Sequence, residues 1–193
     1  MTCIVGYVSE GAVYLGGDSS ITLANLNVNS KTSKVFRNGE YIMGNCGSCR
    51  MGDILEYTFK PPKVKEGGEY DHKFMCTDFV DELMIAYGLA EFDPLKVDSE
   101  DNYVNGGAII VGIRGRMFEI CEDYSCIEYT DHHYAIGCGH NIARGAVYAL
   151  DEENKKLPKK QKKSAEYIVE ASLEAASYYM GAVAPPFNII STK

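Results

Sequence analysis

Residues 1–20, MTCIVGYVSEGAVYLGGDSS, contain two apolar runs separated by a short turn signal. The first run covers residues 2–8, the second covers residues 12–17, and the connection between them holds a glycine. Two such runs joined by a few residues predict a β-hairpin. A hairpin places the end of its second strand beside the beginning of its first. We therefore expect Asp18, which follows the second run, to lie near Thr2.

The periodicity of the apolar residues divides the rest of the chain into blocks of strands and blocks of helices. Such blocks, rather than strict alternation, argue against a doubly wound parallel sheet. They predict a layered α+β fold in which two antiparallel sheets are stacked and covered by helix pairs. The predicted elements are strands at 33–37 and 41–46, helices at about 48–59 and 73–87 with Phe79, Leu83 and Met84 facing inward, loops at 63–71 and 92–105, strands within 106–129 and at 133–138, a helix carrying Ile142 to Leu150, a helix beginning after the N-cap Ser164, and a strand at 187–190.

The composition excludes several classes of protein. The 193 residues carry 19 Lys and Arg against 27 Asp and Glu, a net charge of −8, which argues against a nucleic-acid partner. No apolar run reaches the roughly 18 residues of a membrane span, and the N-terminus lacks a secretory signal pattern. The seven cysteines are scattered, so we expect reduced thiols in a cytoplasmic protein. The length predicts one domain, residues 1–193.

Thr2 becomes a self-contained catalyst once Met1 is removed, a step that small residues at this position favour. Its hydroxyl is then the nucleophile, and its own α-amine, with a pKa of about 7.7–8.0, accepts the proton. Lys34 opens the third predicted strand and can pair with Asp18 and present its ammonium to the hydroxyl. Taken singly, Asp18 is typical of a turn cap and Lys34 of an exposed charge. Together with Thr2 they predict a catalytic site.

Three other groups of residues suggest functions of their own. Cys46 and Cys49 form a CxxC pair without the second ligand pair of a zinc site; a redox role remains open, and the simpler interpretation is two small residues lining a cleft. Cys138 and His140 stand two apart on a turn, where side chains seldom face each other. The lysine-rich segment 155–163 is typical of a solvated connection, with a docking patch for an acidic partner as the alternative. We expect no metal and no cofactor.

Five motifs, in order and at their spacing, carry a resemblance to a known family. They are Thr2-Cys3-Ile4-Val5-Gly6, Gly16-Gly17-Asp18-Ser19, Lys34-Val35, Ile42-Met43-Gly44-Asn45-Cys46-Gly47 and Ala135-Ile136-Gly137-Cys138-Gly139. Through them the sequence resembles the N-terminal nucleophile hydrolases of the proteasome β-subunit type, most closely the bacterial ring protease HslV and its phage-borne relatives. The agreement runs almost without gaps through the first forty residues, and the order of predicted elements agrees over nearly the whole chain.

The resemblance implies a role for four residues. Thr2 matches the catalytic threonine, and Asp18 and Lys34 match the pair that tunes it. Gly44 matches the glycine whose backbone N–H helps form the oxyanion hole. Such a donor is typically worth about 10²–10³ in rate. A glycine at this place also serves tight packing of the strand, and both roles are compatible.

The sequence departs from the family pattern at two places. Cys138 stands where the family has a serine that hydrogen-bonds near the threonine amine, and a thiol is a weaker donor and acceptor. Many relatives support that serine with an aspartate in the last helix. Residues 174–181 hold no aspartate, and Ser177 is the nearest substitute. These changes bear on activity rather than on fold.

The resemblance also implies a function. We expect a four-layer α/β/β/α sandwich and a threonine peptidase that cleaves peptide bonds through an acyl-enzyme on Thr2. The family encloses such sites, so we expect a homo-oligomeric ring, peptide or unfolded protein as substrate, and an AAA+ unfoldase as feeder. One alternative is a catalytically impaired, phage-associated assembly or structural protein with this fold. Another is a hydrolase of small amides that uses the same nucleophile.

Overall fold

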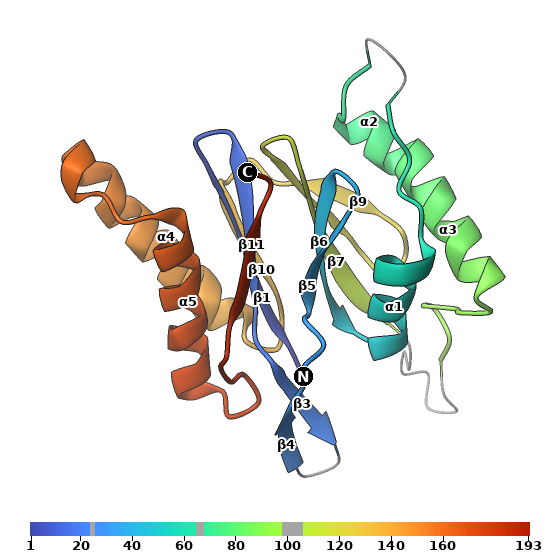
Figure 1. Ribbon diagram of the computed structural model, residues 1–193, viewed down its shortest axis with the longest axis horizontal. Coiled ribbons are helices and arrows are strands. Elements are labelled where there is room, and N and C mark those ends of the chain that lie inside the picture. The colour runs from blue at the N-terminus through green and yellow to red at the C-terminus, as the bar shows by residue number, and fades with distance from the viewer. Residues whose placement is uncertain (24–25, 65–67, 98–105) are drawn as a thin grey trace.

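Two antiparallel sheets form the centre of the computed structural model, which describes residues 1–23, 26–64, 68–97 and 106–193 (Figure 1). The first sheet has the strand order β10-β1-β2-β11, and the second has the order β5-β6-β7-β8-β9. The strands are β1 (Cys3–Ser9), β2 (Ala12–Gly17), β10 (His133–Gly137) and β11 (Asn188–Ser191) in the first sheet, and β5 (Val35–Asn38), β6 (Tyr41–Gly47), β7 (Gly107–Ile113), β8 (Arg116–Ile120) and β9 (Cys126–Glu128) in the second.

Helices cover the outer face of each sheet (Figure 1). The pair α4 (His140–Lys156) and α5 (Ala165–Tyr179) packs on the first sheet, and the segments from α1 to α3 lie over the second. Those segments are α1 (Cys49–Asp53), the π-helical turn η1 (Ile54–Thr58), α2 (His72–Phe74), the π-helical turn η2 (Met75–Phe79) and α3 (Val80–Leu89). The predicted α+β class with stacked antiparallel strands is confirmed.

Three clusters of buried apolar side chains separate these elements. The first lies between the helix pair and the first sheet, the second between the other helices and the second sheet, and the third between the two sheets. Burying one such aliphatic or aromatic side chain contributes about 1.5–3 kcal/mol. Members of the three clusters are, in that order, Val5, Val169 and Leu173; Tyr41, Phe79 and Phe118; and Ile4, Val35 and Ile42.

The third cluster positions the candidate site. Ile4 comes from β1 in the first sheet, and Val35 and Ile42 come from β5 and β6 in the second. Their contact brings the beginning of β1 close to the beginning of β5. As a result, Thr2 and Lys34, the residues that precede these two strands, lie at one end of the interface between the sheets.

Two details of the predicted helices are different in the structure. The helix expected at 48–59 ends in a π-helical turn, and the helix expected at 73–87 contains one between its α-helical parts. Met84 is wrong as an inward residue, because its side chain is 48% exposed. Successive helical residues are about 100° apart, so Met84 lies beside the buried stripe that contains Phe79 and Leu83. The N-cap at Ser164 is confirmed, since its side chain accepts a hydrogen bond from the Tyr167 amide.

One hairpin was not predicted. Strands β3 (Ser20–Leu23) and β4 (Leu26–Asn29) pair with each other in a separate two-stranded sheet beside the N-terminus (Figure 1). Parts of the loops expected at 63–71 and 92–105, namely 65–67 and 98–105, lie outside the described residues. Among the residues that the structure describes, no helix combines the length and the apolarity needed to cross a membrane.

Candidate active site

Thr2 precedes β1 and is held there by the end of β2. The two strands pair with Ile4 opposite Gly17, so Asp18 comes next to Cys3. The Cys3 amide donates to Oδ1 of Asp18 at 2.8 Å, and the Asp18 amide donates to the Cys3 carbonyl at 3.3 Å. Thr2 is 9% exposed and Asp18 is fully buried. The hairpin therefore places a buried carboxylate one residue from the threonine.

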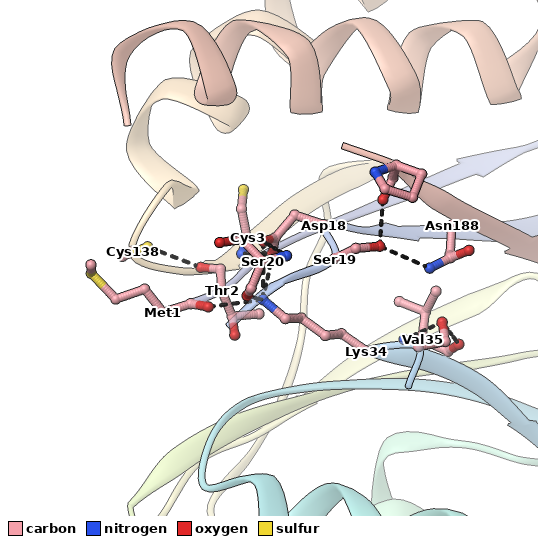
Figure 2. A network of polar contacts seen from close by, with 12 residues as sticks. Met1, Thr2, Cys3, Asp18, Ser19, Ser20, Lys34, Val35, Cys138 and Asn188 are labelled. Atoms are coloured by element: carbon pink, nitrogen blue, oxygen red, sulfur yellow. Dashed lines mark hydrogen bonds and ion pairs between the residues drawn. The ribbon is translucent and has the colours of Figure 1, made fainter. Parts of the chain in front are cut away.

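Lys34 reaches into the same place from the second sheet (Figure 2). Its Nζ lies 2.9 and 3.0 Å from the two carboxylate oxygens of Asp18 and 2.8 Å from the Met1 carbonyl oxygen. It also donates to the Ser20 carbonyl. The ammonium thus joins the carboxylate to the peptide bond that links Met1 to Thr2. An ammonium at this point favours negative charge on a nearby oxygen.

The Asp18 carboxylate is rigidly held, because each of its oxygens also accepts a backbone N–H. Oδ1 accepts from Cys3, as above, and Oδ2 accepts from the Ser20 amide at 3.0 Å. Hydrogen bonds from charged and backbone donors to a buried carboxylate fix its orientation. Since the carboxylate cannot turn, the ammonium that it binds is also fixed.

The turn after β10 closes the other side of Thr2. The thiol of Cys138 donates to the Thr2 carbonyl oxygen, with Sγ and O 3.3 Å apart. Gly137 has a φ of +88°, and a Cβ added there would lie 2.2 Å from the same carbonyl oxygen. Only glycine allows the backbone to approach this closely in this conformation. Cys138 thus contacts Thr2 at its carbonyl oxygen, whereas the resemblance implies a contact near the threonine amine.

Gly137→Ala tests this close approach. We expect it to lower the free energy of unfolding by about 2–3 kcal/mol, because the new Cβ meets backbone and the φ is unfavourable. Gly145→Ala in α4 is the matched control, since a Cβ there meets nothing within 4 Å. It is expected to stabilise the chain by about 0.5–1 kcal/mol. Urea unfolding measures both, and equal stability of the two variants would contradict the proposed contact.

Gly44 is packed between the two sheets. It lies inside β6, opposite Val35 of β5 and Ile110 of β7. A Cβ added to Gly44 would come within 3.0 Å of the Ile4 and Val35 side chains. The structure therefore shows the packing role of Gly44 between the sheets. Its role as an oxyanion donor stays a prediction.

A cavity of about 130 Å³ opens beside Thr2. Its wall combines the threonine, the lysine, the end of β6 and the first turns of the following helix. Two of its side chains are acidic and two are large and apolar. The residues around it are Thr2, Ile21, Thr32, Ser33, Lys34, Phe36, Asn45, Gly47, Ser48, Cys49, Gly52, Asp53 and Glu56. Of the CxxC pair, Cys49 lines this cavity, whereas Cys46 packs against the core between the sheets.

Only part of this arrangement is predictable from the residue types. Gly47 and Ser48 border the cavity with Thr2, and Gly44 is not among the described residues that line it. The contact of Lys34 with the Met1 carbonyl has no signal in the residue types, and neither do the acidic side chains of Asp53 and Glu56. The place of Gly47 in the cavity wall has a signal in the sequence, because this glycine ends the motif that also contains Gly44.

Two thiols close to Thr2 have surroundings that do not favour a nucleophile. Burial, and next the Asp18 charge, raise the pKa of the Cys3 thiol to about 12, so it remains protonated near neutral pH. Cys138 bonds the Thr2 carbonyl, and a ring nitrogen of His140 lies 2.6 Å from the Gly137 carbonyl oxygen. The thiol and the imidazole thus each contact a backbone carbonyl.

The last helix presents an alanine to this turn. A Cβ on Gly139 would lie 3.2 Å from Cβ of Ala176 in α5. Ser177 is the next residue along and is half-buried. Because neighbouring helical residues point about 100° apart, Ala176 rather than Ser177 faces the Gly137–Gly139 turn. Ser177 as the substitute for the family's aspartate stays a prediction.

Comparison with solved structures identifies proteins that have a similar fold. No family model and no curated protein matches the sequence. Among solved structures, BPH of Thiobacillus denitrificans matches with a TM-score of 0.71 and 18% identity, over 98% of this chain and 97% of that one. Eukaryotic HslV from Trypanosoma brucei matches with a TM-score of 0.65 and 20% identity, over 98% of both chains. Anbu, an ancestral β-subunit, from Yersinia bercovieri matches with a TM-score of 0.62 and 12% identity, over 98% of this chain and 81% of that one. These are relatives of proteasome β-subunits, and the chain has their fold.

Proposed function

We propose that this chain, with its proteasome-type β-subunit fold, is a threonine peptidase whose nucleophile is Thr2 after loss of Met1. The observation that carries the proposal is the position of the Lys34 ammonium, which bonds both Asp18 and the carbonyl immediately before Thr2. In this proposal residues 1–193 form one domain, a four-layer α/β/β/α sandwich. The three apolar clusters that separate helices, sheets and helices support that architecture.

The proposed reaction proceeds in two steps. The Thr2 hydroxyl oxygen attacks the scissile carbonyl carbon while the free α-amine of Thr2 accepts its proton, and the Lys34 ammonium favours the developing alkoxide. The carbon–nitrogen bond breaks, the leaving amine takes the proton, and an ester remains on Thr2. Water then hydrolyses the ester and restores the hydroxyl. Peptide N–H groups at Gly47 and Ser48, which border the cavity, are the oxyanion donors in this scheme.

Loss of Met1 is a requirement of this mechanism. While the Met1–Thr2 bond exists, the Thr2 nitrogen is an amide and cannot accept a proton. Met1 is 58% exposed, so its amino end is within reach of a processing enzyme. The same Lys34 contact that holds the Met1 carbonyl becomes free for the substrate when Met1 leaves.

The wider proposal concerns assembly and substrates. We infer a homo-oligomeric ring in the cytoplasm that encloses the Thr2 sites, receives unfolded protein from an AAA+ unfoldase and cleaves it to peptides. The fold shared with HslV and with a protein described as an ancestral β-subunit supports this inference. The 130 Å³ cavity beside Thr2 has the size of one side chain of an extended peptide.

The acidic residues of the cavity predict a preference for cationic side chains. Asp53 and Glu56 line the cavity that we assign to the residue before the scissile bond. An exposed ion pair contributes up to about 1 kcal/mol, so two give about a tenfold preference for Arg or Lys over Leu. Asp53→Asn with Glu56→Gln should remove the preference in kcat/KM and leave Leu substrates unaffected. Glu82→Gln, an exposed position on α3, is the control. An unchanged preference in the double variant would contradict this assignment.

The test of the proposed function is the intact mass of the chain after incubation with a peptide epoxyketone. This warhead needs both a free α-amine and the adjacent hydroxyl, and one similar structure is BPH in complex with epoxomicin. The proposal expects a chain that lacks Met1 and carries one adduct. Thr2→Ala should gain no adduct. A chain that has lost Met1 and still gains no mass would overturn the peptidase assignment.

A second candidate function rests on Cys138 and Ala176. A thiol donates to Thr2 where the family has a hydroxyl, and an alanine faces the neighbouring turn. These features favour a structural or phage-associated assembly protein that has lost catalysis. That candidate expects a closed oligomer by light scattering, no epoxyketone adduct and no peptide turnover. Thr2→Ala should leave the size of the oligomer unchanged.

A further inference from the structure

Three metal-ligating side chains meet on the far side of the second sheet from the candidate active site. His72 begins α2, Cys76 follows four residues later in η2, and Cys126 begins β9. One ligand atom from each, a ring nitrogen and two sulfurs, all lie within 4.8 Å of one another. Helix α2 lies next to β9, as Figure 1 shows. The cluster therefore joins the outer helices to the edge strand of the sheet.

The distances in this cluster match those of a tetrahedral zinc site. The Cys76 sulfur lies 3.6 Å from Nδ1 and 3.4 Å from Nε2 of His72. Zinc with bonds of about 2.0–2.1 Å to nitrogen and about 2.3 Å to sulfur holds those two ligand atoms about 3.5–3.6 Å apart. The sulfur is about equally far from both ring nitrogens, so binding of one ion by both side chains needs a rotation of the imidazole or of the thiol.

One ring nitrogen of His72 contacts a backbone carbonyl, which leaves the other for a metal ion. Its Nε2 lies 3.0 Å from the Cys126 carbonyl oxygen. Donation from Nε2–H to this carbonyl leaves the lone pair on Nδ1, which is free for a ligand. Histidines that bind zinc commonly donate their second ring N–H to a carbonyl in this way. The Asp71 side chain caps the helix by accepting from the Phe74 amide, which fixes the turn that carries His72.

The backbone on both sides of the cluster is anchored in the core. Met75, next to Cys76, is fully buried in the cluster under the outer helices, and Cys126 packs partly against the same cluster. His72 itself is exposed. A metal ion bound here would have three protein ligands and one coordination position open to solvent.

A disulfide between the two cysteines is the main alternative. A disulfide would leave the orientation of His72 without a purpose, whereas a metal ion uses all three side chains.

We propose that His72, Cys76 and Cys126 bind one Zn²⁺ ion, which fastens the α2–α3 helix to the edge strand β9. Borderline-soft Zn²⁺ fits the donor set of one imidazole and two thiols, and Cys₂His with an open fourth position is a known zinc arrangement. Cys121 lies on the β8–β9 connection, and its substitution tests whether it adds a fourth ligand. The proposal is independent of the catalytic role of Thr2.

Cobalt titration of the reduced, metal-free full chain tests this site. We expect one Co²⁺ per chain, with a thiolate-to-metal charge-transfer band and the intense visible bands of tetrahedral cobalt, both lost on addition of one equivalent of Zn²⁺. His72→Ala, Cys76→Ser and Cys126→Ser should each weaken binding at least about 100-fold. Cys49→Ser, an exposed cysteine beside the Thr2 cavity, is the matched control and should bind as the parent chain does.

Two results would overturn the proposal. One is a Co²⁺ spectrum without the thiolate band, and the other is unchanged affinity in Cys126→Ser or His72→Ala. His72 is exposed, so His72→Ala is expected to fold and keeps the test valid if a cysteine variant does not. Zn²⁺ should also raise the Tm of the parent chain and leave that of His72→Ala unchanged. An intact mass two hydrogens lower under non-reducing conditions, restored by a reductant and absent in Cys76→Ser, would show the disulfide instead.

Discussion

Thr2→Ala is expected to lower peptide hydrolysis by about 10⁴-fold or more while leaving the fold intact. The substitution removes the hydroxyl that forms the acyl-enzyme, and no neighbouring group can replace it. Loss of a nucleophile in hydrolases of this kind has effects of that size. The side chain is small and lies at the start of a strand, so the free energy of unfolding should change by less than about 1 kcal/mol. Hydrolysis of a fluorogenic peptide and urea unfolding measure the two effects.

Two variants make this test specific. Thr2→Ser keeps a hydroxyl next to the α-amine, so it should retain measurable turnover. Thr58→Ala makes the same chemical change at an exposed position at the end of η1, and should retain full activity. Undiminished hydrolysis by Thr2→Ala, in a preparation free of other proteases, would show that another residue is the nucleophile.

Lys34→Met should impair both activity and stability. The Lys34 side chain is 12% exposed and that of Asp18 is fully buried, so the substitution leaves a buried carboxylate without its cation. Breaking a buried ion pair in this way costs about 3–5 kcal/mol. Activity should fall by about 10²–10³-fold, because the ammonium no longer stabilises the developing oxyanion. Urea unfolding and kcat/KM measured at a temperature where the variant remains folded separate these two losses.

The exposed ion pair between Arg114 and Glu40 is the matched control. Its side chains are 62% and 40% exposed, so Arg114→Met should cost less than about 1 kcal/mol and leave activity unchanged. Combining Lys34→Met with Asp18→Asn removes the uncompensated charge and should recover part of the stability but none of the activity. A double variant as unstable as Lys34→Met would mean that the charge of Asp18 is not the cause.

The N-terminal hairpin shows how much the sequence can predict. Two apolar runs with a turn between them are enough to place Asp18 beside the start of the first strand, because strand pairing is local there. The same reasoning names Lys34 as the partner. It does not reveal that Lys34 also binds the carbonyls of Met1 and Ser20, since backbone acceptors carry no mark in the residue types.

Other parts of the site depend on contacts between distant segments. Gly44 and Gly47 belong to one motif, and only the position of β6 between β5 and β7 shows that the first packs and the second borders the cavity. His72 and Cys76 have helical spacing in the sequence, but Cys126 joins them only because β9 forms the edge of the sheet next to α2. Pairwise spacing along the chain contains no information about such a meeting.

The candidate site is built from both sheets at once. Thr2 and Asp18 belong to the β1–β2 side, and Lys34 belongs to the β5 side, with the apolar layer of Ile4 and Val35 between them. Apolar side chains hold two sheets together without directional bonds, so they resist sliding less than they resist separation. A displacement of about 1 Å in a catalytic group can cost about 100-fold in rate. The Lys34–Asp18 ion pair is directional and crosses this layer, so breaking it should let one sheet shift against the other and lower the rate before either sheet unfolds.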